Sequence, residues 1–249
     1  MNIQKLTWAG VRLESGGSSI AIDPLFHFPA KFGKPNEEML PLDTFGTVDA
    51  VFITHHHDDH FDPEAIKQFY GDVPVYAPTA ALPIMGERGL KQLIGVELGE
   101  TIEVGQLKVT AAQSVDGFGA PQVSWVVDGE GMKALHCGDT LWHGYWWTIR
   151  RQHGPFDAVC LPVNSAVITI PGLKTSSIPA TLAPEQAVVA ATLLDASYLI
   201  PIHYGTIHNP PAYIQTPDLI ERLESSAHGN VELSLLKPGE SLLLAGAKK

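Results

Sequence analysis

The sequence predicts an α/β fold, arranged as one domain over residues 1–249. Short apolar runs bounded by turn residues recur along the whole chain, as buried strands require. Segments with helix-start signals lie between these runs, which indicates layers of strands and helices around a common core. Of the 249 residues, 45% are hydrophobic and 17% are charged, an ordinary composition for a globular protein. We find no linker and no internal repeat.

The first half of the chain opens with a strand, a turn at Gly16-Gly17 and a returning strand. Asp62 suits a helix N-cap and Pro63 the first helical position, so a helix is expected to continue from there through Tyr70. Residues 27–47 mix proline, glycine and charge and are interpreted as a loop, and Ala80–Leu93 as a broken helical region. The strands expected here are Ile3–Trp8, Ser19–Ile22, Asp49–Thr54 and Val73–Ala77.

The second half begins with several short strands joined by turns that contain glycine. These strands are Glu97-Leu98, Thr101–Val104, Leu107–Ala112, Gln122–Val127 and Met132–Cys137. Helices are expected at Trp142–Gln152, Pro184–Leu194 and Asp218–Ser225. They alternate with strands at Ala158–Val163, Tyr198–Ile202, Val231–Leu236 and Ser241–Leu244.

Charge and cysteine content restrict the environment and the partners. The formal net charge of −11 repels phosphates, and Arg150-Arg151 is too thin a basic cluster to override it, so no nucleic-acid partner is expected. The two cysteines, Cys137 and Cys160, lie in apolar runs and are expected to be free buried thiols. Residues 1–10 lack a signal-peptide pattern, and no apolar stretch is long enough for a membrane span. We therefore expect a cytoplasmic location and no membrane contact, and leave homo-oligomer formation open.

The sharpest motif is Thr54–His60, which reads T-H-H-H-D-D-H. Imidazoles and carboxylates packed this closely form a metal-ligand cluster. The motif follows a predicted buried strand and precedes a capped helix, so the loop presents several side chains at the carboxyl end of the strand. A chance run of surface histidines is rarely flanked by such signals. The mid-chain position of the motif excludes an expression tag.

Three motifs in order resemble the metallo-β-lactamase superfamily. His55-x-His57-x-Asp59-His60 matches its HxHxDH signature, Cys137–Thr140 (C-G-D-T) a later aspartate motif, and Pro201–Thr206 (P-I-H-Y-G-T) its last histidine motif. The resemblance implies a four-layer αββα sandwich. Together with Thr181–Ala187 (T-L-A-P-E-Q-A), the last motif most resembles the branch that contains L-ascorbate-6-phosphate lactonase.

The resemblance also implies a site for two divalent metal ions, zinc or manganese/iron. It places His55, His57 and Asp116 on the first ion, and Asp59, His60 and His203 on the second, with Asp139 bridging the two. Two ions about 3.5–4 Å apart share a water and lower its pKa, so a metal-bridged hydroxide is expected to be the nucleophile. Asp59 is the candidate catalytic residue that orients the nucleophile and takes its proton.

Asp116 is the departure from the superfamily pattern. Relatives usually carry a histidine after the strand that here ends at Ala112, yet no histidine occurs between His60 and His136. Asp116 is the best ligand type in that stretch, and its carboxylate would favour manganese or iron more than a third imidazole would. The alternative is that Asp116 only caps a turn before Gly117 and that the first site is weak or empty.

The remaining polar residues near these motifs have less specific roles. His136 lies within an apolar strand and is expected to be a satisfied core histidine. His143 is expected either to orient a metal ligand or to contact substrate. His208 either lines the pocket or is an ordinary polar loop residue. Asp23 is interpreted as structural, with hydrogen bonds beneath the site.

The leading function is a metal-dependent hydrolase that acts on a small-molecule substrate bearing an ester, lactone or phosphate group. A phosphodiesterase acting on a nucleotide or lipid is the alternative enzyme, although no clear basic or apolar exosite for it is visible. A non-catalytic metal-binding sensor or scaffold is the alternative outside enzymes, and the full ligand set argues against it. A nucleophile elbow and a P-loop are both absent from the sequence.

Overall fold

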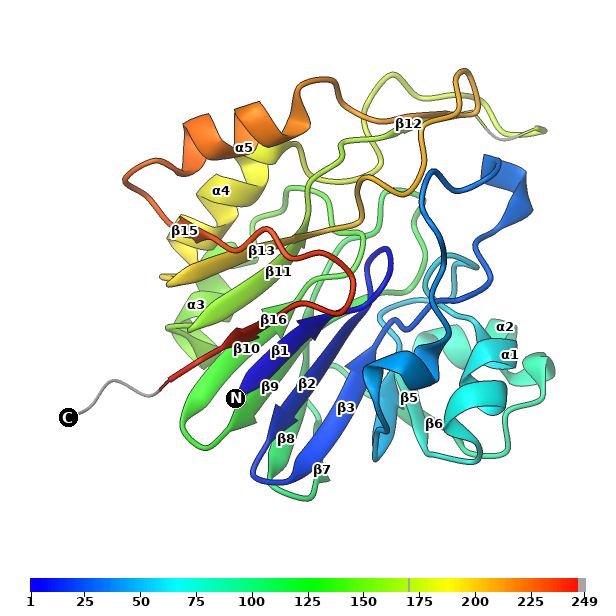
Figure 1. Ribbon diagram of the computed structural model, residues 1–249, viewed down its shortest axis with the longest axis vertical. Helices are drawn as coiled ribbons and strands as arrows, with labels where there is room; N and C mark the ends of the chain where they lie inside the picture. The colour runs from blue at the N-terminus through cyan, green and yellow to red at the C-terminus, as the bar shows by residue number, and fades with distance from the viewer. Residues whose placement is uncertain (170, 246–249) are drawn as a thin grey trace.

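Two seven-stranded sheets dominate the fold (Figure 1), seen in a computed structural model that describes residues 1–169 and 171–245. The first sheet has the order β16-β1-β2-β3-β4-β5-β6 and the second the order β15-β13-β11-β10-β9-β8-β7. The first is built from β1 (Asn2–Lys5), β2 (Val11–Ser15), β3 (Ser18–Ile22), β4 (Ala50–Phe52), β5 (Val75–Pro78), β6 (Leu93–Val96) and β16 (Ser241–Leu243). The second is built from β7 (Thr101–Val104), β8 (Leu107–Gln113), β9 (Val123–Gly129), β10 (Met132–His136), β11 (Ala158–Pro162), β13 (Tyr198–Ile202) and β15 (Glu232–Leu233).

The main core lies between the two sheets, and the alternation of side chains along each strand explains it. In β4, Ala50 and Phe52 face this core while Val51 faces the other side of the sheet. In β11, Ala158 and Cys160 face it while Val159 faces outward. Because both faces of these strands are covered, their sequences are continuous apolar runs and not alternating ones.

Helices cover the outer face of each sheet, which gives the four-layer αββα sandwich and confirms the predicted architecture (Figure 1). The first sheet is covered by α1 (Pro63–Ala65), which continues as a π-helical turn over Ile66–Tyr70, and by the region of α2 (Leu82–Met85). The second is covered by α3 (Trp146–His153), α4 (Pro184–Leu193) and α5 (Leu219–Ala227). Short 3-10 turns occupy Ala30–Phe32, Leu42–Phe45, Thr79–Ala81 and Gly86–Arg88. Within the described residues, no helix combines the length and the apolar character that crossing a membrane demands.

Several local expectations differ from the structure, among them the strand expected at Glu97-Leu98, which is a turn after β6. The expected first strand, Ile3–Trp8, ends at Lys5, because Trp8 has a positive φ of 55° and begins the turn into β2. Strand β6 begins at Leu93, where the broken helical region was expected to end, and it pairs in parallel with β5. The two-stranded pair β12 (Val167–Ile168) and β14 (Tyr213–Ile214) was not anticipated, since runs of two residues carry no periodicity.

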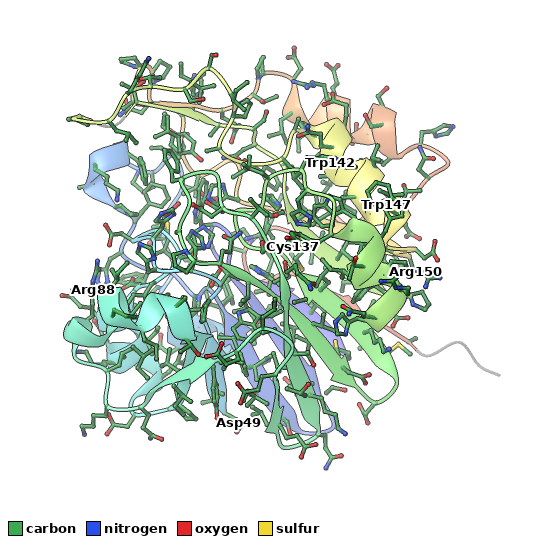
Figure 2. All side chains as sticks on the ribbon, turned by 180° about the vertical axis from the view of Figure 1, so that it is seen from behind. Asp49, Arg88, Cys137, Trp142, Trp147 and Arg150 are labelled. Atoms are coloured by element: carbon green, nitrogen blue, oxygen red, sulfur yellow. The ribbon has the colours of Figure 1, made fainter. Side chains whose placement is uncertain are left out.

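Helix α3 begins at Trp146, later than the expected Trp142. Trp146 is fully buried in the core on the outer side of the second sheet. By contrast, Trp142 and Trp147 are 40% and 56% exposed, and Figure 2 shows both on the side of the molecule that carries α3. Arg150 pairs with Asp195 across the surface, so the Arg150-Arg151 cluster is partly neutralised.

Candidate metal centre

The predicted ligand segments all follow strands, and they come from both sheets. In the first sheet, β4 leads into the loop that carries His55, His57, Asp59 and His60. In the second sheet, β8, β10 and β13 lead respectively to Asp116, Asp139 and His203. The site therefore lies where loops of the two sheets meet, and all seven predicted ligands fall into two groups: Asp59, His60, Asp139 and His203 in one, and His55, His57 and Asp116 in the other.

The first group consists of four buried side chains whose ligand atoms lie within 4.8 Å of one another. One carboxylate oxygen of Asp139 lies 2.9 Å from His60 Nε2, and its other oxygen lies 2.9 Å from His203 Nε2. Asp59 Oδ2 lies 3.4 Å from His203 Nε2 and 3.9 Å from His60 Nε2. Two imidazoles and two carboxylates thus converge on one point, the arrangement that a divalent cation requires.

The second group joins His55 and His57 to Asp116, whose Oδ1 lies 3.9 Å from His55 Nε2 and 3.6 Å from His57 Nδ1. The other oxygen, Oδ2, accepts hydrogen bonds from the backbone N–H groups of Phe118 and Ala120, both at 2.8 Å. The geometry of Asp116 therefore agrees with both alternatives, metal ligand and turn cap: one oxygen faces the two imidazoles and the other closes the turn.

Three neighbouring side chains determine which ring nitrogen each histidine presents. Asp23 accepts from Nδ1 of His60 at 2.7 Å, and Asn164 Oδ1 lies 3.2 Å from Nδ1 of His203. Thr54 Oγ1 donates to Asp23 at 2.6 Å, so it accepts from Nδ1 of His55 at 2.9 Å. In the neutral form of each ring these bonds leave the lone pair on Nε2, which is directed into the site, the usual support for metal-binding imidazoles. The structural role expected of Asp23 agrees with these contacts, whereas Thr54 and Asn164 were not foreseen.

The chemistry of the donor set fits metal ions. Nε2 of His55 is buried and lacks a hydrogen-bond partner among the described residues, and Nε2 of His60 and Oδ1 of Asp139, 2.9 Å apart, are buried without a well-directed hydrogen bond. Such buried polar groups are costly unless a ligand satisfies them. Burial lowers the pKa of His55 well below its usual value, which keeps this imidazole in the neutral form that binds metals.

His60 and Asp139 shift each other's pKa in opposite directions. Burial acts to lower the pKa of His60, but the carboxylates of Asp139 and Asp23 raise it well above its usual value. Burial likewise opposes ionisation of Asp139, yet His203 and His60 hold its pKa well below the usual range. The carboxylates therefore require positive charge beside them, which either protons on the histidines or divalent cations supply.

Trp8 is a site residue that sequence reasoning missed. Its indole Nε1 donates to Asp59 Oδ2 at 3.3 Å, and its ring packs on that of His203 with centroids 4.0 Å apart. Trp8, Asp23 and His203 all have left-handed backbone, with φ of 55°, 47° and 60°. Strained backbone of this kind gathers at functional sites. The turn Thr7–Gly10 that carries Trp8 contains no ligand-type residue that would have marked it in the sequence.

Gly138 explains why a glycine precedes the aspartate in the C-G-D-T motif. A Cβ at this position would lie 2.6 Å from Thr54 Oγ1, and φ there is 55°. Glycine therefore allows the loop after β10 to approach the hydroxyl that orients His55. This contact links the aspartate motif of the second sheet to the histidine motif of the first.

The other predicted histidines lie outside both groups. His136 is buried, with Nε2 2.9 Å from the carbonyl of Ala9, which agrees with a satisfied core histidine. His143 stacks on Trp146 with centroids 4.0 Å apart, and burial lowers its pKa to about 4. His208 is exposed and lines a surface cavity beside Tyr204 and Gln215. The substrate or orienting roles of His143 and His208 stay predictions.

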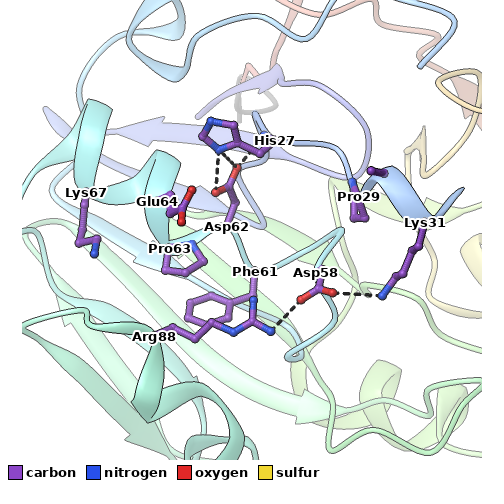
Figure 3. A pocket seen from close by; sticks show the side chains of 11 residues that line it. His27, Pro29, Lys31, Asp58, Phe61, Asp62, Pro63, Glu64, Lys67 and Arg88 are labelled. Atoms are coloured by element: carbon purple, nitrogen blue, oxygen red, sulfur yellow. Dashed lines mark hydrogen bonds and ion pairs between the residues drawn. The ribbon is translucent and has the colours of Figure 1, made fainter. Parts of the chain in front are cut away.

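The outer side of the ligand loop borders a cavity of about 630 Å³ (Figure 3). Asp58, between the two halves of the HxHxDH motif, faces this side and pairs with Lys31 at 3.1 Å and with Arg88 at 2.8 Å. Asp62 caps α1 by accepting from Ala65 N–H and also accepts from the backbone of residues 26 and 27, which confirms the predicted N-cap. Adjacent aspartates of one motif thus have opposite orientations: Asp59 toward the ligand group and Asp58 away from it.

Comparison with known proteins gives the class to which this arrangement belongs. The sequence profile of the beta-lactamase superfamily domain matches residues 7–204. A UPF0173 metal-dependent hydrolase of Rubrobacter xylanophilus is 30% identical over 239 residues, covering 91% of this chain and 89% of that protein. The structure of Igni18, a metallo hydrolase of Ignicoccus hospitalis, aligns with a TM-score of 0.72 and 20% identity over 97% of each chain. An isothiocyanate hydrolase from Delia radicum gut bacteria aligns with a TM-score of 0.76 and 19% identity over 99% of this chain and 100% of that chain.

The αββα sandwich with a histidine- and aspartate-rich centre at the meeting of its sheets defines a metallo-β-lactamase-type protein. The chain belongs to the β-lactamase superfamily and is a metal-dependent hydrolase within it. The narrower resemblance to the L-ascorbate-6-phosphate lactonase branch stays a prediction.

Proposed function

We propose that this chain hydrolyses a small ester or lactone at a two-metal centre, with water as the nucleophile. The observation that carries the proposal is the pair of adjacent ligand groups, with seven side chains within reach of two ions. His55, His57 and Asp116 would hold one ion, and Asp59, His60, Asp139 and His203 the other. Bound divalent ions supply Lewis acidity and a water of lowered pKa.

The cysteine thiols are excluded as nucleophiles, which favours water. Cys137 and Cys160 are both buried, and burial raises the pKa of each thiol to about 12. A thiolate is therefore negligible at neutral pH. With the thiols excluded, we assign the nucleophile to solvent water, and the task of accepting its proton to a carboxylate at the site.

Asp59 is the residue to which we assign that proton. Its Oδ2 accepts from Trp8 Nε1 and lies beside His203, so the carboxylate is held in one orientation. Burial acts to raise the pKa of Asp59, but the hydrogen bond from His203 and the nearby charge of His60 lower it overall. The carboxylate is therefore ionised at neutral pH. In this assignment Asp59 orients the attacking water and accepts its proton, and Trp8 Nε1 holds the carboxylate in place.

The substitution Asp59→Asn tests this assignment, and Asp58→Asn is its matched control in the same loop. Asn cannot accept the proton, so Asp59→Asn is expected to reduce kcat by roughly 10²-fold or more while the fold is retained. Asp58 pairs outward with Lys31 and Arg88, and its variant is expected to keep most of the activity. Near wild-type turnover by Asp59→Asn with both metals bound would show that the base lies elsewhere.

A substrate panel on the metal-loaded protein tests the reaction class. It contains γ-butyrolactone, phenyl acetate, bis(p-nitrophenyl) phosphate and phenethyl isothiocyanate. The isothiocyanate is included because one protein of similar fold is an isothiocyanate hydrolase. We expect hydrolysis of the lactone or the ester. Turnover of the phosphodiester alone would support the phosphodiesterase, and a fully loaded protein inactive on the whole panel would favour a sensor or scaffold.

A further inference from the structure

A third cavity, of about 290 Å³, lies beside the ligand group of Asp116 and has mostly apolar walls. We call it the apolar pocket, and its large apolar side chains are those of Phe118, Leu141, Ile168, Leu173 and Ile178. Three of them, Phe118, Leu173 and Ile178, are 44%, 52% and 71% exposed. Large apolar side chains that gather at solvent around one cavity typically mark a binding site.

The walls of the apolar pocket continue directly from the metal centre. Gly117 and Phe118 follow Asp116 in the chain, and the Phe118 ring lies edge-on to the imidazole of His57, with centroids 6.1 Å apart. Leu141 donates its backbone N–H to the carbonyl of Val115 at 2.8 Å, which joins the loop of Asp139 to the loop of Asp116. A molecule whose reacting bond lies at the metal ligands can therefore extend a substituent into the apolar pocket.

The opposite wall is also tied to the metal centre. The segment that carries Ala166 and Ile168 begins at Asn164, which orients His203, and Ala166 accepts from the backbone N–H of Ala180 at 2.9 Å. A Cβ on Gly117 would lie 2.2 Å from the carbonyl oxygen of Ala180, so the two walls are in close contact at this glycine. The pocket shape thus depends on the same loops that position the ligands.

Charge distinguishes the apolar pocket from the cavity on the outer side of the ligand loop. That outer cavity has Lys31, Lys67 and Arg88, matched by the carboxylates of Asp58, Asp62 and Glu64 (Figure 3), so it holds no excess positive charge for a phosphate. The apolar pocket has one charged lining residue, Lys174, which is exposed. Neither cavity fits a substrate with several phosphates.

We propose that the apolar pocket binds an uncharged alkyl or aryl substituent of the substrate, whose ester or lactone group lies at the metal centre. The proposal rests on the proposed function for the position of the reacting bond. Each methylene group transferred from water to the pocket is worth about 0.8 kcal/mol, or about fourfold in kcat/KM. Substrates with a longer alkyl chain are therefore preferred until the chain outgrows the pocket.

A homologous series measures this preference. kcat/KM is determined for γ-butyrolactone, γ-hexalactone and γ-octalactone, and for phenyl acetate, butanoate and hexanoate. In the wild type it is expected to rise by about fourfold per methylene. Leu173→Asp should remove most of that rise, because it places a carboxylate in the apolar lining. The control Leu98→Asp alters a leucine of similar exposure, 57%, in the turn between β6 and β7, and should leave the rise intact.

A binding experiment separates failure of this inference from failure of the proposed function. Methyl NMR spectra of the metal-loaded protein are recorded during titration with 1-hexanol, with ethanol as the short-chain comparison. The signals of Ile168 and Leu173 are expected to shift and saturate with 1-hexanol, and Leu98 to stay constant. Saturable shifts without turnover of any lactone or ester would support the pocket and count against the hydrolase assignment. A flat chain-length series, or no shift at Ile168 and Leu173, would overturn the pocket proposal.

Discussion

At the scale of single residues, Asp116 combines two tasks that substitution can separate. Asp116→Asn keeps an oxygen that accepts from the N–H groups of Phe118 and Ala120 but lacks the charge that faces His55 and His57. We expect this variant to retain the turn and to lose about one of two metal ions, because a neutral amide is a poorer ligand. Elemental analysis gives the metal content, and amide hydrogen exchange at residues 118–120 reports the turn.

Asp116→Ala removes both tasks and serves as the comparison. It should lose the same ion and also increase hydrogen exchange in the turn. Full metal occupancy in Asp116→Asn would mean that Asp116 only closes the turn, and that the protein works without a carboxylate at this position.

Thr54 gives a second prediction at this scale. Its hydroxyl, fully buried, donates to Asp23 and accepts from His55. Thr54→Val keeps the shape of the side chain but leaves Nδ1 of His55 without its acceptor and removes one of the hydrogen bonds to Asp23, so metal affinity should fall by roughly 10- to 100-fold. Competition with a chelator of known affinity measures the change. Thr54→Ser retains the hydroxyl and should restore most of the affinity, whereas equal affinities in all three proteins would rule out the orienting role.

At the scale of elements, the start of α1 depends on Asp62. This side chain accepts from the backbone N–H groups of Ala65, Phe26 and His27, and so joins the helix to the preceding loop. Asp62→Ala leaves these donors without that acceptor, and we expect the free energy of unfolding to fall by about 1–3 kcal/mol. Urea denaturation of the metal-free protein measures it. Asp62→Asn keeps an acceptor and should lose less, and equal losses would show that the charge matters more than the cap.

The elements also show what the sequence could and could not reveal. Strand β13 matches the expected Tyr198–Ile202, and α4 ends one residue before the expected Leu194, because apolar periodicity and helix-start residues are local signals. Strands β12 and β14 form only by pairing with each other, although more than forty residues of chain separate them, so neither has a local sequence signal. The metal centre shows the same contrast. Its ligand motifs were visible in the sequence as clusters of histidine and aspartate. Trp8, Thr54 and Asn164 became site residues only through contacts made by folding.

At the scale of the whole molecule, bound metal is expected to stabilise the sandwich. Anything that binds the folded chain and not the unfolded one raises stability, and the site also concentrates carboxylates that need positive charge. We expect about two ions per protomer in protein purified without chelator, and a lower Tm after chelation that recovers when zinc or manganese is restored. An unchanged Tm, or fully active protein without transition metal, would contradict a structural and catalytic role for the ions.

The two sheets contribute ligands to the same centre, and this has a consequence for the kinetics of metal exchange. His55, His60 and His203 are at most 1% exposed, so an ion at their Nε2 atoms is held by packed side chains from both sheets, while water and substrate reach it past the partly exposed His57. Release then requires the loops of the two sheets to separate, a sub-global opening that few molecules populate at any moment. Ion exchange should therefore be slow and limited by opening of the fold, with the same rate for chelators of different strength. A cell that supplies the wrong ion during folding would leave the protein carrying that ion for a long time.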